Sequence, residues 1–381
     1  MSFQPRLITS TDEFIGLEQV WNDLLAKSPA DNYFLSWEWL WNWWQVYGRP
    51  EDRLAILVIE NGEEIAGIAP FYLRKRFHRG VYPVRRMMFL GTQDNSSGDV
   101  CSDYMNIICL EGLEERMVRT VFEQLVNRNI CDEVFLSRMD NSSKVFGIFR
   151  EHAGRNGCLN LTTEECTSPY IKLPVSWEEY MKGLSGSMRQ KIRREFRKLE
   201  KYDFTISRAE SPDAVFRYYG ELVRLHKKRW NSRGIEGAFS NELFNQFHKK
   251  IMPSMLQKGR LELKLLLENG ESRAAIYNIK YKNKIYFYQC GVDTSGKKAA
   301  FGYALHARCI EDAIKEGMAE YDFLPKAGGD NYKEHFAKQK RTVSNVYVIR
   351  QWALKRIMFA EETARLICRH VKPYFGKKTY D

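Results

Sequence analysis

The sequence lacks a long apolar run, a cysteine framework and any metal-ligand spacing. None of its 381 residues belongs to a stretch of the ~18 apolar residues that a membrane-spanning helix needs. Its eight cysteines include no C-x-x-C pair, the histidines show no ligand spacing beside them, and residues 1–6 do not resemble a secretory leader. We therefore expect a cytoplasmic chain with reduced thiols, no membrane span and no bound metal.

The composition is that of an ordinary globular protein with an excess of positive charge. Hydrophobic residues make up 44% and charged residues 28% of the chain, and the length allows two domains with a large core. The formal net charge of +11 predicts an anionic partner. Nucleic acid, acidic lipid head groups and a phosphorylated small molecule all satisfy that charge, and net charge alone does not choose among them.

The first 50 residues predict two helices. Ser10 begins a capping-box pattern, and apolar residues then recur at helical spacing as far as Leu25. Residues 34–47 contain five tryptophans, which make this segment too aromatic on all sides for a surface helix. No basic residue interleaves them, so we favour a core or domain interface over a base-stacking platform.

The remainder of the first half predicts mixed α and β structure. Residues 54–60 and 65–73 form a hairpin around Asn61-Gly62, a turn that favours positive φ at both residues. Further strands are expected at 84–90, 105–110 and 133–137, and helices at 113–127 and 142–156. The polar loop at 91–103 is either a solvated connector or a lid over a substrate.

A weak repeat suggests two similar domains. Residues 60–63 and 268–271 both read Glu-Asn-Gly-Glu, each follows an Arg-Leu pair, and each is bounded by β-type runs. Such a match around a common turn supports a duplicated unit without establishing it.

The second half predicts a basic helix followed by an antiparallel meander. A strand at 168–173, a short helix at 176–183 and a capping box beginning at Ser187 precede seven cations between Arg189 and Lys201, which face only two acidic residues. This face is either solvated or binds an anion. Other elements are expected as helices at 214–230 and 241–256, strands at 261–267, 273–280, 284–292 and 343–349, and a basic terminal helix at 351–372.

A strand, a cationic glycine loop, a helix and a strand follow one another after residue 284. Gly302 opens the helix, Gly317 occupies its C′ position, and a strand follows at 320–324. Backbone N–H groups at the start of the helix, together with Lys297 and Lys298, would bind a pyrophosphate. A plain turn is the alternative.

This order of elements resembles the GNAT acyltransferase superfamily, and its CelD-like (BcsL-type) branch more closely. The segments that carry the resemblance are 34–39 (FLSWEW), 68–70 (IAP), 169–174 (PYIKLP), 187–194 (SMRQKIRR), Gly317, 321–323 (YDF) and 330–333 (DNYK). The resemblance implies an α+β fold with two tandem GNAT-like domains, here 1–165 and 166–350, before a basic C-terminal helix at 351–381. It also implies an acyl-CoA site in the second domain and a link to cellulose or exopolysaccharide synthesis.

One position departs from that family's pattern. The phosphate loop of the superfamily normally begins with Arg or Gln, and Ala299 stands there in this sequence, although Gly302 and Ala304 fit. The chain is also similar to the Fem-type peptidyltransferases, which use aminoacyl-tRNA.

The expected chemistry is acyl transfer to an amine. Backbone groups near Gln289 and Gly291 would hold the thioester carbonyl, Asp322 or Glu320 would deprotonate the amine, and a tyrosine would protonate the leaving sulfur. The candidate tyrosines are Tyr288, Tyr303 and Tyr332. Cys290 is interpreted as a packed thiol because no histidine stands close to it in sequence.

Other residues are expected to bind the donor or the acceptor. Phe301, Gly302 and Tyr303 would join Lys297 and Lys298 around the CoA. The acceptor would contact Arg189, Arg193, Arg229 and Lys333.

Three functions therefore remain open. The first is an acyl-CoA N-acyltransferase that acts on a small amine, such as an amino sugar or nucleotide-linked sugar, which can carry negative charge. The second is an aminoacyl-tRNA-dependent transferase, the one case in which a nucleic acid partner is expected. The third is a non-catalytic binding protein of the same fold. Peripheral contact with a membrane is compatible with all three.

Overall fold

The computed structural model describes residues 3–78, 82–93, 98–202, 204–232, 234–293, 300–325 and 332–350, with 352, 353, 356 and 359 beyond them. The helices are α1 (Thr11–Gly16), α2 (Glu18–Lys27), α3 (Trp37–Tyr47), α4 (Glu114–Val121), α5 (Lys144–Arg155), α6 (Trp177–Gly183), α7 (Gly186–Lys201), α8 (Pro212–Asn231), α9 (Glu242–Gln257), α10 (Phe301–Lys315) and α11 (Tyr332–Phe336). Short turns of other helix types cover Tyr33–Leu35, Phe122–Val126 and Ala238–Ser240. The terminal helix expected at 351–372 lies almost wholly outside the described residues.

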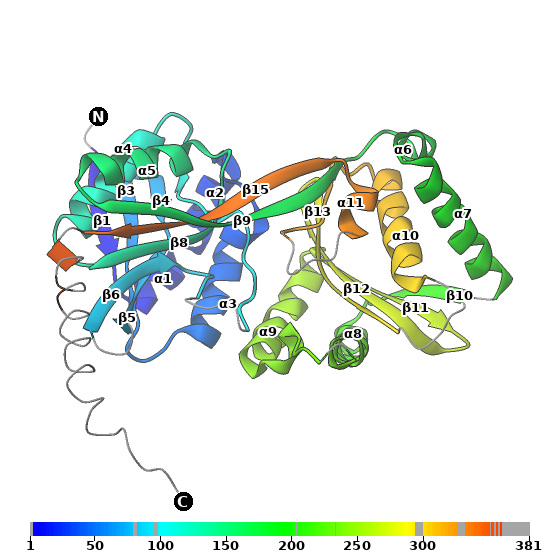
Figure 1. Cartoon of the computed structure of the whole chain (residues 1–381). Coiled ribbons are helices and arrows are strands. Elements are labelled where there is room, and N and C mark those ends of the chain that lie inside the picture. Colours follow the sequence, from blue (N-terminus) through cyan, green and yellow to red (C-terminus); the bar gives the residue numbers. More distant parts are fainter. Residues whose placement is uncertain are drawn as a thin grey trace, which may run out of the picture.

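The strands form two sheets, most of whose pairs are antiparallel. They are β1 (Phe3–Ile8), β2 (Arg53–Leu54), β3 (Ile56–Asn61), β4 (Glu64–Ala69), β5 (Phe71–His78), β6 (Tyr82–Phe89), β7 (Ile108–Cys109), β8 (Glu133–Asp140), β9 (Leu159–Lys172), β10 (Phe204–Arg208), β11 (Leu261–Glu268), β12 (Glu271–Tyr281), β13 (Lys284–Val292), β14 (Glu320–Asp322) and β15 (Gln339–Ile349). One sheet has the order β1-β3-β4-β7, and the other has the order β10-β11-β12-β13-β14-β9-β15-β8-β6-β5-β2. Helices flank both sheets (Figure 1), so the expected α+β class is confirmed.

The two halves repeat one order of elements. In the first half β1 precedes the helices α2 and α3 and pairs with β3, which forms a hairpin with β4. In the second half β10 precedes α8 and α9 and pairs with β11, which forms a hairpin with β12. The sequence repeat therefore marks equivalent hairpins.

The two hairpin turns nevertheless differ in conformation. Asn269 and Gly270 both have positive φ, at 52° and 81°, whereas in the first hairpin Gly62 has φ 68° and Asn61 does not have positive φ. The expectation for Asn61 was wrong because Asn61 is the last paired residue of β3 and faces Glu64, whereas the last pair of the second hairpin is Glu268 with Glu271, which leaves Asn269 in the turn.

Strands β9 and β15 cross from one half to the other. They pair along their whole length, from Leu159 with Ile349 to Tyr170 with Gln339. The end of β9 pairs with β14 in the second half, and β15 also pairs with β8 in the first half. The expected boundary at 165/166 thus falls inside β9, and β15 completes the first half's part of the long sheet (Figure 1). The division into 1–165 and 166–350 stays a proposal.

One helix begins earlier than the sequence indicated. Ser185, rather than Ser187, is the N-cap of α7, and its Oγ accepts a hydrogen bond from the backbone N–H of Met188 at 3.2 Å. The expected C′ position of Gly317 is confirmed, since α10 ends at Lys315 and Gly317 has φ 72°.

The tryptophan-rich helix α3 joins the two halves through their cores. Trp39 is 0% exposed. Its ring lies 4.7 Å from that of Phe247 on α9 and 5.9 Å from that of Tyr288 on β13, and its Nε1 donates to Ser102 Oγ at 2.8 Å. Polar contacts border this core, because Glu38 pairs with Lys258 and Arg260 of the second half. The interpretation of this segment as core and interface is confirmed.

We expect Trp39→Ala to lower the free energy of unfolding by about 3–5 kcal/mol, because it removes a fully buried indole from the joint between the halves. Denaturant unfolding monitored by circular dichroism would measure this. The matched control is Phe77→Ala, whose side chain belongs to a residue that is 62% exposed and which should change stability by less than about 0.5 kcal/mol. Equal effects of the two changes would show that α3 does not hold the halves together.

Candidate active site

Strands β13 and β14 separate to form a fork. They run parallel and pair only between Lys284–Tyr286 and Glu320–Asp322, after which β14 ends while β13 continues to Val292. Within the described part of the chain, no strand pairs with that edge of β13 beyond Tyr286. On its other edge, a bulge against β12 places Gln289 opposite Tyr277 and Phe287 opposite Asn278. The fork therefore presents a free strand edge to a ligand.

Four side chains meet at this fork, and we call Arg229, Cys290, Tyr332 and Lys333 the fork cluster. Desolvation raises the pKa of Cys290, whereas the charges of Arg229 and Lys333 and the polar side chains of Tyr332 and Arg229 oppose that shift. Lys333 Nζ donates to the carbonyl oxygens of Phe323 at 2.6 Å and Leu324 at 3.2 Å. Desolvation lowers the pKa of Lys333 to about 8, although the nearby Cys290 and Asp103 raise it. The structure thus brings Tyr332, proposed as a proton donor, close to Arg229 and Lys333, which were both proposed to contact the acceptor.

A loop of the first half delivers carboxylates to the same place. Desolvation raises the pKa of Asp103 to about 6, against the lowering effect of Arg138, whose Nη1 lies 3.2 Å from Asp103 Oδ1. Desolvation likewise raises the pKa of Asp99 to about 7. This is the polar loop predicted as a connector or lid, of which residues 94–97 lie outside the described part. Sequence reasoning missed these two carboxylates, because the loop meets the second half only in the folded chain.

His306 is a second residue that sequence reasoning missed. It lies on α10, is 2% exposed, and its ring centroid is 4.5 Å from that of Phe287 and 5.6 Å from that of Tyr332. Neither ring nitrogen has a hydrogen-bond partner among the described residues. Desolvation, with the charges of Lys333 and Arg229, lowers the pKa of His306 to about 3, so the imidazole is neutral.

Asp322, at the point where the fork opens, is fully buried and multiply hydrogen-bonded. Its carboxylate is 2.8 Å from the Tyr104 hydroxyl and accepts from Ser168 Oγ at 2.9 Å, the Leu324 N–H at 2.7 Å and Arg341 Nη1 at 2.7 Å. Desolvation raises its pKa, and Arg341 opposes that shift. Arg341 also bonds Glu320, the alternative base, at 2.8 Å. This carboxylate therefore connects segments of both halves.

The residues expected around the thioester on β13 have packing roles as well. The Tyr288 hydroxyl donates to the carbonyl of Val100 and lies 3.1 Å from His248 Nε2. Gly291 allows α8 to approach β13, since a Cβ there would lie 2.8 Å from the backbone nitrogen of His226. Gln289 is partly exposed on the free part of the strand.

The start of α10, expected to bind a diphosphate, already holds an anion of the chain itself. The N–H of Ala300, the N-cap residue, donates to Glu195 Oε2 at 2.8 Å, and Glu195 is 1% exposed. A Cβ on Gly302 would lie 3.2 Å from Val292 Cγ2. Lys297, Lys298 and Ala299 lie outside the described residues.

The aromatic residues of the first turn of α10 face different neighbours. Phe301 is buried against Phe204, with ring centroids 5.5 Å apart. The Tyr303 hydroxyl is 3.0 Å from His335 Nδ1, and Lys191 Nζ lies over the Tyr303 ring.

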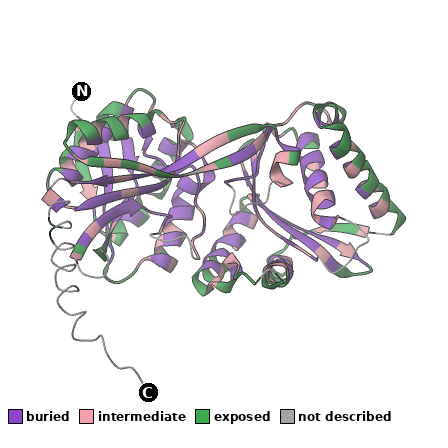
Figure 2. Ribbon diagram, in the orientation of Figure 1, coloured by how far each residue is buried: buried purple, intermediate pink, exposed green. Residues whose placement is uncertain are grey.

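Some of the cations of the predicted basic helix α7 bond to other groups of the same chain. Arg189 Nη1 donates to the carbonyl of Leu184 at 2.6 Å, at the end of α6. Arg193 is exposed, and Figure 2 shows the outer face of α7 in the colour of exposed residues. Arg189 is thus engaged at the end of α6 rather than in the fork cluster.

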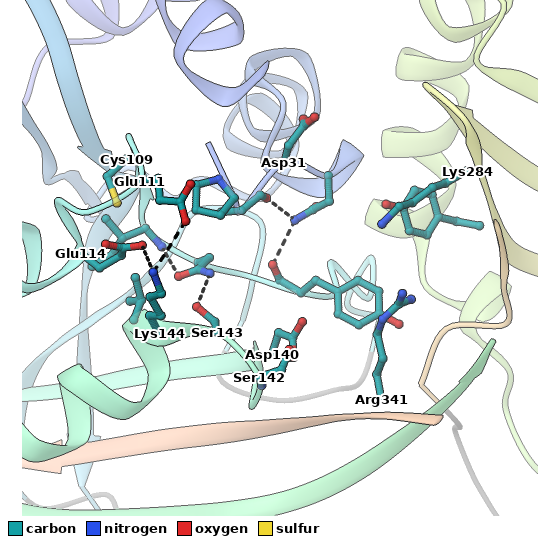
Figure 3. Close-up of a pocket in the computed structure, with 18 residues that line it drawn as sticks. Asp31, Cys109, Glu111, Glu114, Asp140, Ser142, Ser143, Lys144, Lys284 and Arg341 are labelled. Carbon is teal, nitrogen blue, oxygen red and sulfur yellow. Dashed lines mark hydrogen bonds and ion pairs between the residues drawn. The ribbon is translucent and has the colours of Figure 1, made fainter. Parts of the chain in front are cut away.

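A charged cavity of about 310 Å³ lies between the two halves. Lys144 Nζ stands 3.8 Å from carboxylate oxygens of Glu111 and Glu114, and Lys284 and Arg341 enter from the second half (Figure 3). Tyr104, which lines the cavity, is the residue whose hydroxyl reaches Asp322. The cavity therefore reaches, through Tyr104, the buried Asp322 at the start of the fork, although none of the fork-cluster residues lines it.

Two further properties concern the described residues only. None of the helices described is long and apolar enough to span a membrane. No group of three or more His, Cys, Asp or Glu side chains among these residues is arranged to hold a metal ion.

Comparison with known proteins places this geometry in an acyltransferase fold. Residues 186–334 match the family model described as an acetyltransferase (GNAT) domain. FemX is similar in structure over 93% of this chain and 99% of its own, with 9% identity and a TM-score of 0.60. No curated protein matches the sequence.

Lysylphosphatidylglycerol synthetases are similar in fold too. The C-terminal domain (DUF2156) of a putative synthetase from Agrobacterium fabrum matches over 91% of this chain and 95% of its own, with 9% identity and a TM-score of 0.52. L-PGS from Bacillus licheniformis matches over 93% and 96%, with 11% identity and a TM-score of 0.51. Identities this low show the fold alone. The GNAT resemblance is confirmed, whereas the CelD-like branch stays a proposal.

We expect Asp322→Asn to lower the free energy of unfolding by about 3–5 kcal/mol, because it removes a buried charge that pairs with Arg341 and leaves Glu320 as the only carboxylate that the structure shows bonded to that guanidinium. Denaturant unfolding at neutral pH would measure the loss. The control is Glu151→Gln, which breaks an exposed ion pair with Arg155 and should cost less than about 1 kcal/mol. A loss no larger than in the control would mean that Asp322 does not hold the halves in register.

Proposed function

We propose that this protein is a cytoplasmic N-acyltransferase that moves an acyl group, in the first instance acetyl, from CoA to an amine. The acceptor is a sugar or nucleotide-sugar type molecule used in polysaccharide synthesis. The fork cluster is the observation that supports this reaction type. There the edge of β13 that β14 has left lies near the Lys333 ammonium and near Cys290, whose neighbours are polar. All of these residues belong to the segment that matches the GNAT domain. The acceptor class rests on the motif resemblance to the CelD-like branch.

The free edge of β13 and Lys333 would polarise the reacting carbonyl. Backbone groups between Gln289 and Gly291 are not used by β14, so an N–H there can donate to the thioester oxygen as negative charge develops on it. The Lys333 ammonium, already fixed by two carbonyl oxygens, adds a full charge in a site of low dielectric. Tyr332, a polar neighbour of Cys290, would protonate a departing sulfur.

Asp103 is the proton acceptor that we propose first for the amine. Its pKa of about 6 makes it a carboxylate at neutral pH with an affinity for protons close to the working pH. Asp322 remains a second proposal for this role, although its two oxygens already accept from at least three donors and none of its surface is exposed.

The cavity between the halves is where we place the acceptor. Asp31 and Asp140 on one side would attract an amine, while Lys284 and Arg341 on the other would bind an anionic part of the same molecule. An acceptor with both charges matches the expectation of an amine that carries negative charge.

A specific contact favours the alternative of an aminoacyl-tRNA donor. The Glu195 carboxylate accepts from the first N–H of α10, and Ala299 replaces the Arg or Gln of the usual phosphate loop, so two features oppose a diphosphate at this position. The exposed cations of α7 would then follow an RNA backbone, with binding that weakens steeply as salt rises.

Titration calorimetry with acetyl-CoA tests the donor. If Lys297, Lys298 and Gly302 hold the diphosphate, changing them together to alanine should weaken binding by about tenfold or more, equivalent to about 1.4 kcal/mol. Glu195→Gln should strengthen binding, since it removes a negative charge at the same N–H. The control changes Lys249 and Lys250, exposed on α9, and should leave the affinity unchanged.

Other outcomes of that titration point elsewhere. Unchanged affinity in the triple variant would remove the proposed diphosphate site. Copurified tRNA that is released by salt would favour the aminoacyl-tRNA alternative, and tight CoA binding with no transfer would favour a non-catalytic binding protein.

The pH dependence of kcat/KM should be bell-shaped. Activity should rise through pH ~6 as Asp103 loses its proton and can accept another, and fall through pH ~8 as Lys333 loses the charge that polarises the carbonyl. Lys333→Arg keeps the charge and should move the descending limb to higher pH. An unshifted descending limb in that variant would show that Lys333 does not set it.

A further inference from the structure

Cys290 differs from the other cysteine of the same cleft in the charges around it. Both Cys290 and Cys101 are partly exposed. Desolvation, with the charges of Asp99 and Asp103, raises the pKa of Cys101 to about 12, against the lowering effects of Arg138 and Lys333. Desolvation also raises the pKa of Cys290, but all of its named neighbours, Arg229, Lys333 and Tyr332, lower it. Neighbouring positive charge favours the thiolate, which is the form of cysteine that reacts as a nucleophile, over the thiol.

A buried histidine near Cys290 has ring nitrogens without a hydrogen-bond partner among the described residues. The ring of His306 lies 5.6 Å from that of Tyr332, a polar neighbour of Cys290, and the charges of Lys333 and Arg229 lower the pKa of His306. Both ring nitrogens are without a hydrogen-bond partner in the part of the chain that the structure describes, in a residue that is 2% exposed. A buried imidazole normally has such a partner, so His306 has a donor and an acceptor available for a polar group that binds beside the cluster.

The position of Cys290 on its strand is the third observation. It follows the bulge at Tyr288 and lies on the part of β13 whose edge β14 has left. A thioester carbonyl bound to that edge would lie next to the Cys290 sulfur rather than at a distance from it.

We infer that Cys290 is a catalytic nucleophile that takes the acyl group from the donor as an enzyme-bound thioester and then passes it to the acceptor amine. The inference deepens the proposed acyl-transfer function and rests on it. It adds a covalent intermediate to that reaction. Because the amine then receives the acyl group from Cys290, the second step is the same whichever donor supplied the acyl group.

Both steps balance without a further reactant. In the first, the Cys290 sulfur bonds to the carbonyl carbon of the acyl thioester, the carbon–sulfur bond of the donor breaks, and the thiol proton passes to the leaving sulfur. In the second, the neutral amine bonds to the carbonyl carbon, the Cys290 carbon–sulfur bond breaks, and a proton from the nitrogen returns to the Cys290 sulfur. Arg229 and Tyr332 stabilise the sulfur while it carries charge, and Lys333 polarises the carbonyl.

Mass spectrometry of the whole protein tests the intermediate. The full chain is incubated with acetyl-CoA, and separately with p-nitrophenyl acetate as a donor without phosphates, in each case without an amine. We expect one acetyl group per chain, located on Cys290 and not on Cys101 by peptide mapping, and removed by hydroxylamine. Acetylation of Cys290 by both donors, or by p-nitrophenyl acetate alone, supports the inference; in the second case the CoA assignment fails and the nucleophile stands.

Variants separate a nucleophile from a packed thiol. Cys290→Ala should abolish the adduct and lower kcat by more than about a thousandfold, the order expected when a catalytic nucleophile is removed. Cys158→Ala, which changes a partly exposed cysteine outside the cleft, should retain adduct and turnover. Arg229→Lys should slow acetylation of Cys290 while leaving the melting temperature near that of the wild type.

Several results would overturn the inference. A kcat of Cys290→Ala equal to that of the wild type would show that the acyl group passes directly from donor to amine. Rapid transfer by the wild type with no acetyl group trapped on Cys290 would show the same. Failure of both donors to acetylate Cys290, or labelling of Cys101 at an equal rate, would do the same. If Cys290→Ala is unfolded by circular dichroism, the mapping of the wild-type adduct and the rate in Arg229→Lys decide the question.

Discussion

The buried carboxylate of Asp322 is the constraint on which the arrangement of the two halves depends. A carboxylate taken out of water is tolerated only when donors replace the water, and its donors here come from Tyr104, from Ser168 on β9 and from Arg341 on β15. Since these belong to segments far apart in the sequence, the carboxylate is satisfied only when all of them are in register. The fork opens directly after this residue, so the geometry of the site is set by the same contact that orders the halves.

Opposite charges reach the fork from opposite halves. The first half supplies Asp99 and Asp103, and the second supplies Arg229 and Lys333. Desolvation acts on both sets in the direction that disfavours charge, which raises the pKa of Asp103 to about 6 and lowers that of Lys333 to about 8. The proton affinities of an acid and a base that differ widely in water thus approach each other near neutral pH. This is the condition under which a site can move protons in both directions during one reaction.

Sequence patterns within single elements predicted much of the fold. The site could not be predicted to the same extent, because it is formed by segments that lie far apart in the sequence. Amphipathic periodicity located α8 and α9, alternation located the meander β11 to β13, and Gly317 marked a helix end, because each signal lies within one element. Arg229 and Lys333 were proposed as contacts of the acceptor and Tyr332 as a proton donor, but the sequence did not indicate that the three form one cluster. His306 and Asp103 were missed, since α10 and the first-half loop meet β13 only after folding. For the same reason β15 could be predicted as a strand but not as a partner of β8.

Two features at the start of α10, one in the sequence and one in the structure, both disfavour a bound diphosphate. Ala299 lacks the donor that the usual phosphate loop carries, and Glu195 brings an internal carboxylate to the Ala300 N–H. Desolvation raises the pKa of Glu195, but Ala300, Arg194 and Lys198 together lower it below its usual value, so the carboxylate stays charged. A diphosphate would have to displace this anion, whereas the acyl group need only reach the β13 edge and the Cys290 sulfur. Recognition of the acyl carrier at the start of α10 and acyl transfer at β13 therefore depend on different residues. Loss of the carrier site in evolution would not by itself remove the residues that we propose for acyl transfer.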